Sequence, residues 1–293
     1  MIEAIELEHR FFERYPYLIV DAKRREEIPA SWAAVPIAPI FLGNDTARCP
    51  LLIDTAAISA VERNALLERL ATETAAREET FVSLALTCAK SFARLRRHLI
   101  QRIEIPRYKE PSRQFRYFDP GTFIQLPDVI GPAGISWLLG PIDAVAVGWL
   151  GEWQRYANPM HADADHFRLR EHMDALLAFS VVNRVLMTQR ASLRGQQDWR
   201  DKANATRAIV DHALATYGLD QRDDLIAFAC HAWQWHRAFD SHPTLQTLLA
   251  KLAAASPEDK LDYRQLTTHL DKADWQKIAE DLHAATTAEG KPQ

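Results

Sequence analysis

Glycine and cysteine are scarce in this chain. Only 10 of its 293 residues are glycine, which is few for an all-β protein rich in tight turns, and the composition therefore favours helices. The three cysteines, Cys49, Cys88 and Cys230, are widely spaced and form no Cys-x-x-Cys pair. An odd number of cysteines without a regular framework predicts reduced thiols in a cytosolic protein.

The motifs of several large enzyme classes are also missing. The segment Gly134–Leu138 lacks the second glycine of a nucleophile elbow, and the chain has neither a phosphate-binding nor a dinucleotide-binding glycine loop. Asp21, Asp54 and Asp119 follow apolar runs and would form a carboxylate cluster if those runs ended together. Capping and turn formation explain each of them singly, so we predict no acid–base site and no cofactor.

No segment has the pattern of an export signal or a membrane span. The first residues carry three glutamates in place of the basic start and apolar core of a signal peptide. The most apolar window, Ile135–Leu150, is interrupted by Gly140-Pro141. The net charge of −4 excludes a globally basic nucleic-acid binder. We therefore expect a cytoplasmic protein without membrane insertion and without a nucleic-acid partner.

The first half of the chain mixes short apolar runs with helical patterns. Ser59 and Glu62 have the spacing of a capping box for a helix that continues to about Arg77. Ser91–Gln101 has the spacing of a second helix, with Phe92, Leu95 and Leu99 facing inward and Arg94, Arg97 and Gln101 facing outward. We interpret residues 1–155 as an α/β lobe around a mixed sheet. Its predicted strands are Tyr17–Asp21, Leu51–Asp54, Thr80–Leu86, Ile103–Ile105, Phe115–Phe118 and Val145–Trp149.

The second half loses the strand signals and keeps helical spacing. The predicted helices are Phe167–Met187, Trp199–Tyr217, Asp220–Phe239, Thr244–Ala255 and Trp275–Ala285. A further helix start is predicted at Ser256–Asp259, with Ser256 as the N-cap and acidic residues in the first turn. Residues 167–285 are thus predicted as a helical lobe, joined to the first lobe by residues 156–166. A disordered tail is expected over residues 286–293. Together the two lobes define an α+β fold.

The segment Arg113–Pro141, RQFRYFDPGTFIQLPDVIGPAGISWLLGP, is rich in aromatic residues and in Gly-Pro pairs. Its first aromatic residues alternate with period 2, which predicts a half-buried strand over Phe115–Phe118. Asp119 then suits a helix N-cap and Pro120 the first helical position. A short helix is therefore expected directly after this strand.

Phe115-Arg116-Tyr117-Phe118-Asp119-Pro120 resembles the FRYYDP signature of the adaptor (chaperone) proteins of bacterial type VI secretion. Other segments are similar to this family in the same order. They are the strands YLIVDA and PLLIDT, the helix Leu95–Leu99, the segment Leu139–Ile142, Tyr217-Gly218-Leu219 and Phe239-Asp240. The chain departs from the family at Gly121–Phe123, where Arg-Val-Leu is usual, so the contact of that arginine does not carry over.

The resemblance implies a non-enzymatic adaptor in the cytoplasm of a Gram-negative bacterium. Such adaptors bind the N-terminal region or the PAAR-type tip domain of a secreted toxin effector and load it on the VgrG spike. The family offers no catalytic residues to carry over. The signature residues are expected to hold the fold, with Asp119 as a cap and Tyr117 or Arg116 closing over it. They are Arg116, Tyr117, Phe118, Asp119, Pro120, Gly140 and Pro141.

Partner binding by such an adaptor needs a moderate interface with aromatic anchors and a charged rim. The candidate residues are Arg94, Arg96 and Arg97 on the helix Ser91–Gln101, together with Trp233 and Tyr156. Tyr156 belongs to a third candidate, an expected groove between the lobes near Tyr156–His166. Tryptophan is enriched at interface hot spots. The alternative is that Trp233 is half-buried at a contact between the lobes.

Two other functions stay open. His161, Asp163, Asp165 and His166 would serve a metal-dependent hydrolase if a turn brought them together; otherwise they form a polar loop, with Asp165 capping the next helix. An arginine-rich stretch would bind nucleic acid or an acidic partner, or would be a solvated face. Its basic residues are Arg94, Arg96, Arg97, Arg102, Arg107, Lys109, Arg113 and Arg116.

Overall fold

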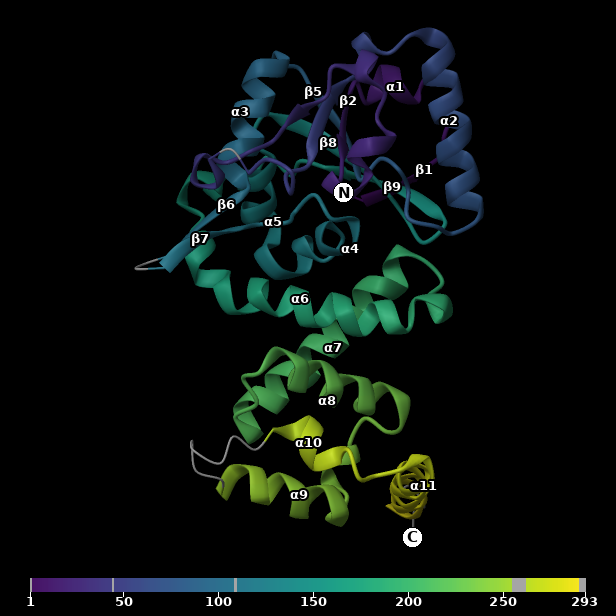
Figure 1. The fold of residues 1–293 in the computed structure, drawn as a ribbon, viewed down its shortest axis with the longest axis vertical. Coiled ribbons are helices and arrows are strands. Elements are labelled where there is room, and N and C mark those ends of the chain that lie inside the picture. The colour runs from purple at the N-terminus through teal and green to yellow at the C-terminus, as the bar shows by residue number, and fades with distance from the viewer. Residues whose placement is uncertain (1, 44, 108–109, 255–261, 290–293) are drawn as a thin grey trace. The chain divides into compact units, whose positions relative to one another are not determined.

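The computed structural model of the chain describes residues 2–43, 45–107, 110–254 and 262–289. It divides into two compact units. Unit 1 extends to Met173 and includes Leu193–Arg200, and unit 2 comprises Asp174–Ser192 and the chain from Asp201 onward. Every described strand belongs to unit 1 and unit 2 is helical, which confirms the predicted α+β class (Figure 1).

The borders of these units differ from those of the predicted lobes. The predicted connection, residues 156–166, lies within unit 1, partly in a strand and partly in a short 3₁₀ helix at Ala162–His166. Residues 193–200 also belong to unit 1, although they follow the first helix of unit 2. Residues 193–200 pack with unit 1 because Trp199 is fully buried there, and its indole N–H donates to the carbonyl oxygen of Gly121 at 2.9 Å.

A seven-stranded sheet forms the centre of unit 1. In sheet order its strands are β1 (Ile2–Ile5), β9 (Glu152–Ala157), β8 (Ile142–Trp149), β5 (Leu84–Cys88), β2 (Tyr17–Val20), β4 (Leu51–Asp54) and β3 (Val35–Pro36). All neighbouring strands are antiparallel, so the predicted mixed sheet is corrected to an antiparallel one. Apolar patterns show which segments become strands, whereas the direction of each strand depends on how the connections cross the sheet.

A separate two-stranded sheet pairs β6 (Glu104–Arg107) with β7 (Glu110–Gln114). Glu104 and Ile105 of the predicted strand Ile103–Ile105 therefore belong to this separate sheet and not to the main one. The predicted strand Phe115–Phe118 is wrong, because the chain turns directly after β7. Its side chains do not alternate between core and solvent, since Tyr117 and Phe118 are both buried.

Both single-turn and longer α-helices accompany the main sheet in unit 1. They are α1 (Phe11–Arg14), α2 (Ala60–Ala75), α3 (Phe92–Arg102), α4 (Pro120–Phe123) and α5 (Leu126–Leu139); Figure 1 shows α2 and α3 beside the sheet. The predicted capping box of α2 is confirmed, because Ser59 Oγ accepts from Glu62 N at 3.3 Å and Ser59 N donates to Glu62 Oε2 at 3.0 Å. Leu66 and Leu70 of α2 join an apolar cluster with residues of β2, β5 and β8.

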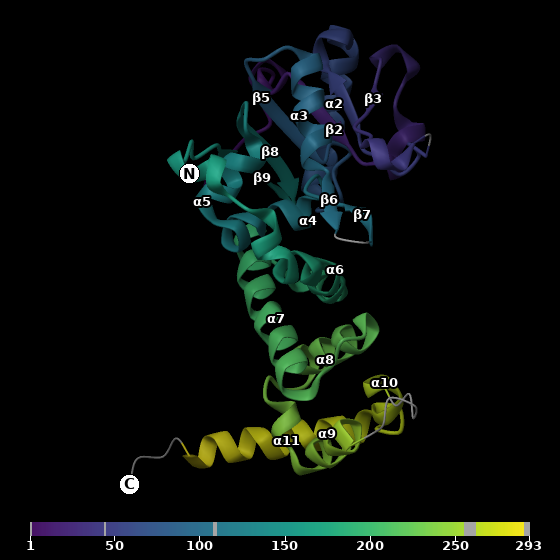
Figure 2. The same cartoon turned by 90° about the vertical axis from the view of Figure 1, so that its left-hand side faces the viewer.

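Unit 2 consists of helices around its own apolar core. Its helices, which Figure 2 shows from a second direction, are α6 (Met173–Thr188), α7 (Gln196–Tyr217), α8 (Arg222–Gln234), α9 (Pro243–Ala254), α10 (Tyr263–Thr267) and α11 (Lys272–Glu289). The ring centre of Phe228 lies 4.8 Å from that of Phe239 and 5.4 Å from that of Tyr263. The five predicted helices are present with shifted ends, although Ala255 lies outside the described residues and the first turn of α7 belongs to unit 1. The predicted helix start at Ser256–Asp259 lies outside the described residues, and α10 begins after it, at Tyr263.

The predicted disordered tail is corrected in part. Helix α11 continues to Glu289, and residues 290–293 lie outside the described residues. Among the helices that the structure describes, none combines the length and the apolar composition that crossing a membrane needs.

Candidate functional site

The FRYFDP segment forms a buried turn at the start of α4. Phe118 is completely buried and Tyr117 is 3% exposed. The predicted cap is confirmed, because Asp119 Oδ1 accepts from Thr122 N at 3.0 Å and Pro120 occupies the first turn of α4. Burial raises the pKa of the Asp119 carboxyl, and the hydrogen bond from Thr122 partly offsets this shift.

Of the two polar residues expected to close over Asp119, Arg116 lowers the pKa of that carboxyl through its charge and so opposes the effect of burial, but both residues form their hydrogen bonds elsewhere. Arg116 Nη2 donates to Asp21 Oδ2 at 2.9 Å. The Tyr117 hydroxyl donates to Leu99 O in α3 at 3.2 Å. Neither partner is visible in the local pattern, because they lie 95 and 18 residues away along the chain.

Asp21 and Asp119 line one small cavity of about 30 Å³. Two of the three aspartates considered as a carboxylate cluster are thus brought together. All three aspartates nevertheless cap backbone N–H groups in their own segments. Asp119 does so as described above, Asp21 Oδ1 accepts from Lys23 N at 3.0 Å, and Asp54 Oδ1 accepts from Ala56 N at 2.9 Å. The predicted capping roles are confirmed, and the volume of the cavity suits water rather than an organic substrate.

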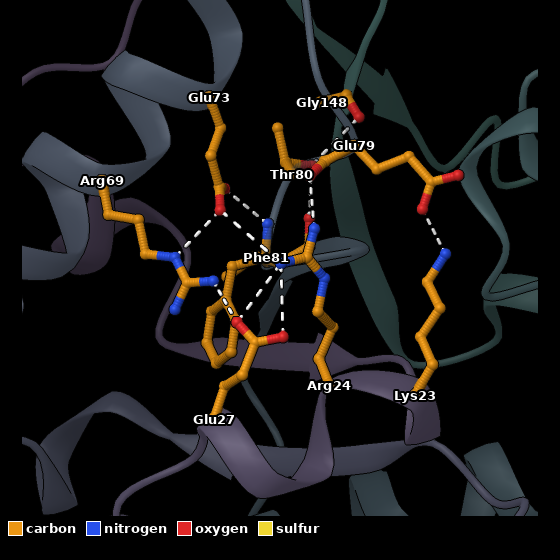
Figure 3. A network of polar contacts seen from close by, with 10 residues as sticks. Lys23, Arg24, Glu27, Arg69, Glu73, Glu79, Thr80, Phe81 and Gly148 are labelled. Atoms are coloured by element: carbon orange, nitrogen blue, oxygen red, sulfur yellow. Dashed lines mark hydrogen bonds and ion pairs between the residues drawn. The ribbon is translucent and has the colours of Figure 1, made fainter.

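A network of ion pairs borders this cavity (Figure 3). Lys23 pairs with Glu79, and Arg69 pairs with both Glu27 and Glu73. The other oxygen of Glu73 accepts a backbone N–H at 2.6 Å. The spacing of Arg69 and Glu73 on α2 is visible in the sequence, but their partners from the loop after β2 are visible only in the fold. Because its charges are paired, this network supports the fold rather than forming a site.

Helix α3 presents two of its three candidate arginines to solvent. Leu95 and Leu99 are buried, Phe92 is half-buried, and Arg94 and Arg97 are exposed, as predicted. Arg96 is half-buried, and its Nε and Nη2 both donate to Pro36 O at 3.1 Å. Arg94 and Arg97 are therefore available to a partner, whereas Arg96 ties α3 to β3.

The arginine-rich stretch does not form one continuous basic face. Arg102 Nε donates to a backbone carbonyl of α5 at 2.9 Å, and Arg116 is paired as described above. Arg113 is exposed, while the side chains of Arg107 and Lys109 lie outside the described residues. Among the described members, several cations are thus engaged within the fold, and a nucleic-acid backbone needs several free ones.

Tyr156 and Trp233, the other candidates for partner binding, have partners within their own units. Tyr156 is 3% exposed in β9, and its hydroxyl donates to Gln196 Oε1 at 2.9 Å, so it is not available to a partner. Trp233 is half-buried in α8, and its indole N–H donates to Thr206 Oγ1 at 2.8 Å. The guanidinium carbon of Arg237 lies 3.7 Å from the centre of the Trp233 ring. These contacts fit a structural role for Trp233 better than a free aromatic anchor.

The residues of the metal alternative lie on an exposed 3₁₀ helix. His161 Nδ1 accepts from Asp163 N at 3.2 Å and caps this helix, and Asp165 lies inside it rather than capping the next one. The side chains of all four residues, His166 included, are exposed. Within the described part of the chain, no group of three or more His, Cys, Asp or Glu side chains is placed to hold a metal ion. The structure thus does not bring these four residues together in the way that the metal alternative required.

An open groove of about 250 Å³ lies where the end of α3, helix α5 and this 3₁₀ helix meet. Gly140 of the Gly-Pro segment forms part of it, with a φ of +51°, and a Cβ at this position would collide with the His98 ring. The groove thus joins three segments that the sequence analysis treated separately. Its lining residues are Arg102, Ser136, Trp137, Gly140, Asn158, Met160, His161, Ala164 and Asp165.

The segments that carry the family resemblance contact one another within each unit. In unit 1, Tyr117 bonds to α3, and His98 Nε2 of the same helix lies 2.8 Å from Leu138 O, beside the Gly-Pro segment. In unit 2, the Tyr217 hydroxyl donates to Asp240 Oδ2 at 2.8 Å. Burial and the Asp240 carboxylate raise the pKa of Tyr217 to about 12, so the hydroxyl keeps its proton and stays a donor.

Comparison with known proteins identifies no relative, because no family model, no curated protein and no solved structure matches the chain. The structure itself defines the class as an α+β protein with an antiparallel sheet in one unit and helices in the other.

Proposed function

We propose that the protein is a non-enzymatic adaptor of type VI secretion. In this proposal it binds the N-terminal region or the PAAR-type tip domain of a toxin effector in the cytoplasm of a Gram-negative bacterium and loads it on the VgrG spike. The physical task of such an adaptor is to cover apolar surface on a client that would otherwise aggregate, and later to release it.

One observation carries this proposal, namely the contact between segments in which the chain resembles the adaptor family. The FRYFDP turn bonds to α3 through Tyr117, and the Tyr217-Gly218-Leu219 segment bonds to the Phe239-Asp240 segment. Short matches scattered by chance along a sequence would have no reason to meet in the fold. Their packing against one another supports treating them as parts of one family framework.

The surface around α3 has the composition that a client interface needs. Arg94 and Arg97 are exposed and supply a charged rim. Ile40, on the segment after β3, is 92% exposed, and Arg96 ties β3 to α3. Unit 1 thus exposes cations on α3 and an apolar side chain four residues along the chain from Pro36, which Arg96 contacts, and protein interfaces combine both kinds of side chain.

Affinity purification of the tagged full-length protein from the cytosol of its native cell tests the proposal. We expect an effector or a VgrG protein to co-purify with the wild-type chain. The double variant Arg94→Glu/Arg97→Glu should recover at least about tenfold less of that partner, a loss of about 1.4 kcal/mol in binding free energy.

The matched control is the double variant Lys272→Glu/Lys277→Glu, which makes the same charge change on exposed positions of α11. It should recover the partner as well as the wild type does. Recovery of neither an effector nor a spike protein by the wild-type chain would contradict the adaptor function. Equal losses in both double variants would contradict the role of α3.

A further inference from the structure

Unit 1 contains a positive charge that is half-buried and forms no ion pair with a carboxylate of the described residues. Arg102, at the end of α3, donates through Nε to Trp137 O at 2.9 Å, and its guanidinium carbon lies 4.2 Å from the centre of the Trp137 ring. Burial lowers the pKa of the guanidinium, and no Asp or Glu of the described residues offsets this shift. Arg69 and Arg116, by contrast, each face a carboxylate.

An unpaired charge in a partly desolvated position is unfavourable unless a partner supplies the opposite charge. Arg102 lines the open groove of about 250 Å³. The Trp137 ring centre lies 5.2 Å from that of Phe167, which in turn stacks on His172 at 5.1 Å. The cation therefore stands at one end of a row of aromatic rings, which offers apolar contact area beside the charge.

Met160 is held in an unusual conformation at the rim of this groove. It is 75% exposed and has a φ of +52°, a region that costs a non-glycine residue roughly 1 kcal/mol. Two hydrogen bonds fix it there: Met160 N donates to Asn158 Oδ1 at 3.0 Å, and His161 N donates to Ser136 Oγ at 2.8 Å. Strain of this kind is typical of binding sites, and methionine is an adaptable apolar contact.

We propose that this groove binds an acidic peptide segment of a protein partner, with a carboxylate on the Arg102 guanidinium and an adjacent apolar side chain against Trp137 and Met160. The volume admits one or two side chains. Arg102 is the one arginine or lysine among the lining residues, whereas a nucleic-acid backbone needs several cations. Asp165 also lines the groove but is not among the groups that act on the Arg102 guanidinium, so it leaves that charge unpaired. The inference goes beyond the adaptor function, because it assigns a partner chemistry to a defined site.

A titration of the full-length, ¹⁵N-labelled protein tests the groove directly. The probe is the peptide acetyl-GLDLG-amide, and the readout is the indole N–H resonance of Trp137, assigned with a Trp137→Phe variant. We expect a saturable shift. The peptide acetyl-GLNLG-amide, which replaces the carboxylate by an amide, should bind at least about tenfold more weakly.

Variants then locate the contact. Arg102→Gln removes the charge and keeps hydrogen-bond donors, and it should abolish the preference for the acidic peptide. Met160→Gly should weaken the binding of both peptides while raising the melting temperature, because glycine relieves the backbone strain. Arg48→Gln, an exposed arginine outside the groove, is the matched control and should bind like the wild type.

Equal affinity of the wild-type protein for the two peptides would overturn the proposal. This comparison uses the wild type alone, so it does not depend on whether any variant folds. An unchanged preference in folded Arg102→Gln would also overturn it. Stronger binding of a single-stranded oligonucleotide, or equal binding of free N-acetylaspartate, would assign the groove to another ligand and refute the peptide. If an effector or spike protein co-purifies but neither peptide binds, this inference is refuted and the adaptor function stands. If the acidic peptide binds as expected but no effector or spike protein co-purifies, the adaptor function is refuted and this inference stands.

Discussion

Acidification is expected to destabilise unit 2 through His231. This side chain of α8 lies in the aromatic core, with its ring centre 4.2 Å from that of Trp275 and its Nδ1 2.7 Å from the Tyr263 hydroxyl. Burial lowers the pKa of His231 from 6.5 to about 4. The folded protein therefore holds this imidazole neutral at a pH where an unfolded chain would protonate it.

The sign of the effect follows from where the proton binds. Between about pH 6.5 and about pH 4 the unfolded chain binds more protons at this position, so the free energy of unfolding falls as the pH falls. The stability that the neutral ring provides is present above about pH 6.5 and is lost towards about pH 4. A shift of about 2.5 pKa units corresponds to about 3 kcal/mol, of which about 2 kcal/mol are lost between about pH 7 and about pH 5.

Urea unfolding of the full-length wild type and of His231→Gln at these two pH values measures this loss. Glutamine keeps a polar group for Tyr263 and does not titrate. At the higher pH the variant should be the less stable protein, because it loses contact with Trp275, and the gap should shrink by about 2 kcal/mol at the lower pH. A gap that does not change with pH would refute the reasoning. His166→Gln, on an exposed side chain, is the matched control and should show no such change.

The remaining predictions concern the Asp119 cap, two glycines with positive φ and the hydroxyl of Tyr217. Asp119→Ala should lower the free energy of unfolding by about 1 kcal/mol in urea unfolding, and a loss above about 3 kcal/mol would show that more than a cap is removed. Gly140→Ala should lower the melting temperature more than Gly43→Ala, because both glycines have positive φ but only Gly140 faces a histidine ring; equal losses would contradict the packing argument. Tyr217→Phe removes the donor to a buried carboxylate and should cost about 1 kcal/mol, and an unchanged melting temperature would count against that hydrogen bond.

The candidate residues show which features of the site local sequence patterns could predict and which they could not. Arg94 and Arg97 were predicted to be exposed because helical spacing separates them from the apolar residues of α3, and the structure agrees. Tyr156 was assigned to a connection between lobes, but it is buried in β9. A groove was expected near Tyr156–His166, and part of this segment does line one, but the groove lies within unit 1 rather than between lobes. Its other walls, from α3 and α5, were not predicted, because the lining residues are spread over about sixty residues of chain and no local pattern joins them.

The sequence by itself determined the elements that depend on near neighbours. The caps at Ser59 and Asp119 and the helices of the second half depend on residues within about four positions of one another, whose contacts form whenever the helix forms. Only the tertiary structure decided the antiparallel order of the sheet, the turn at Phe115–Phe118 and the isolation of the Arg102 charge. These features depend on which distant segments exclude water from each other, and that free energy is set by burial in the folded chain rather than by any local pattern.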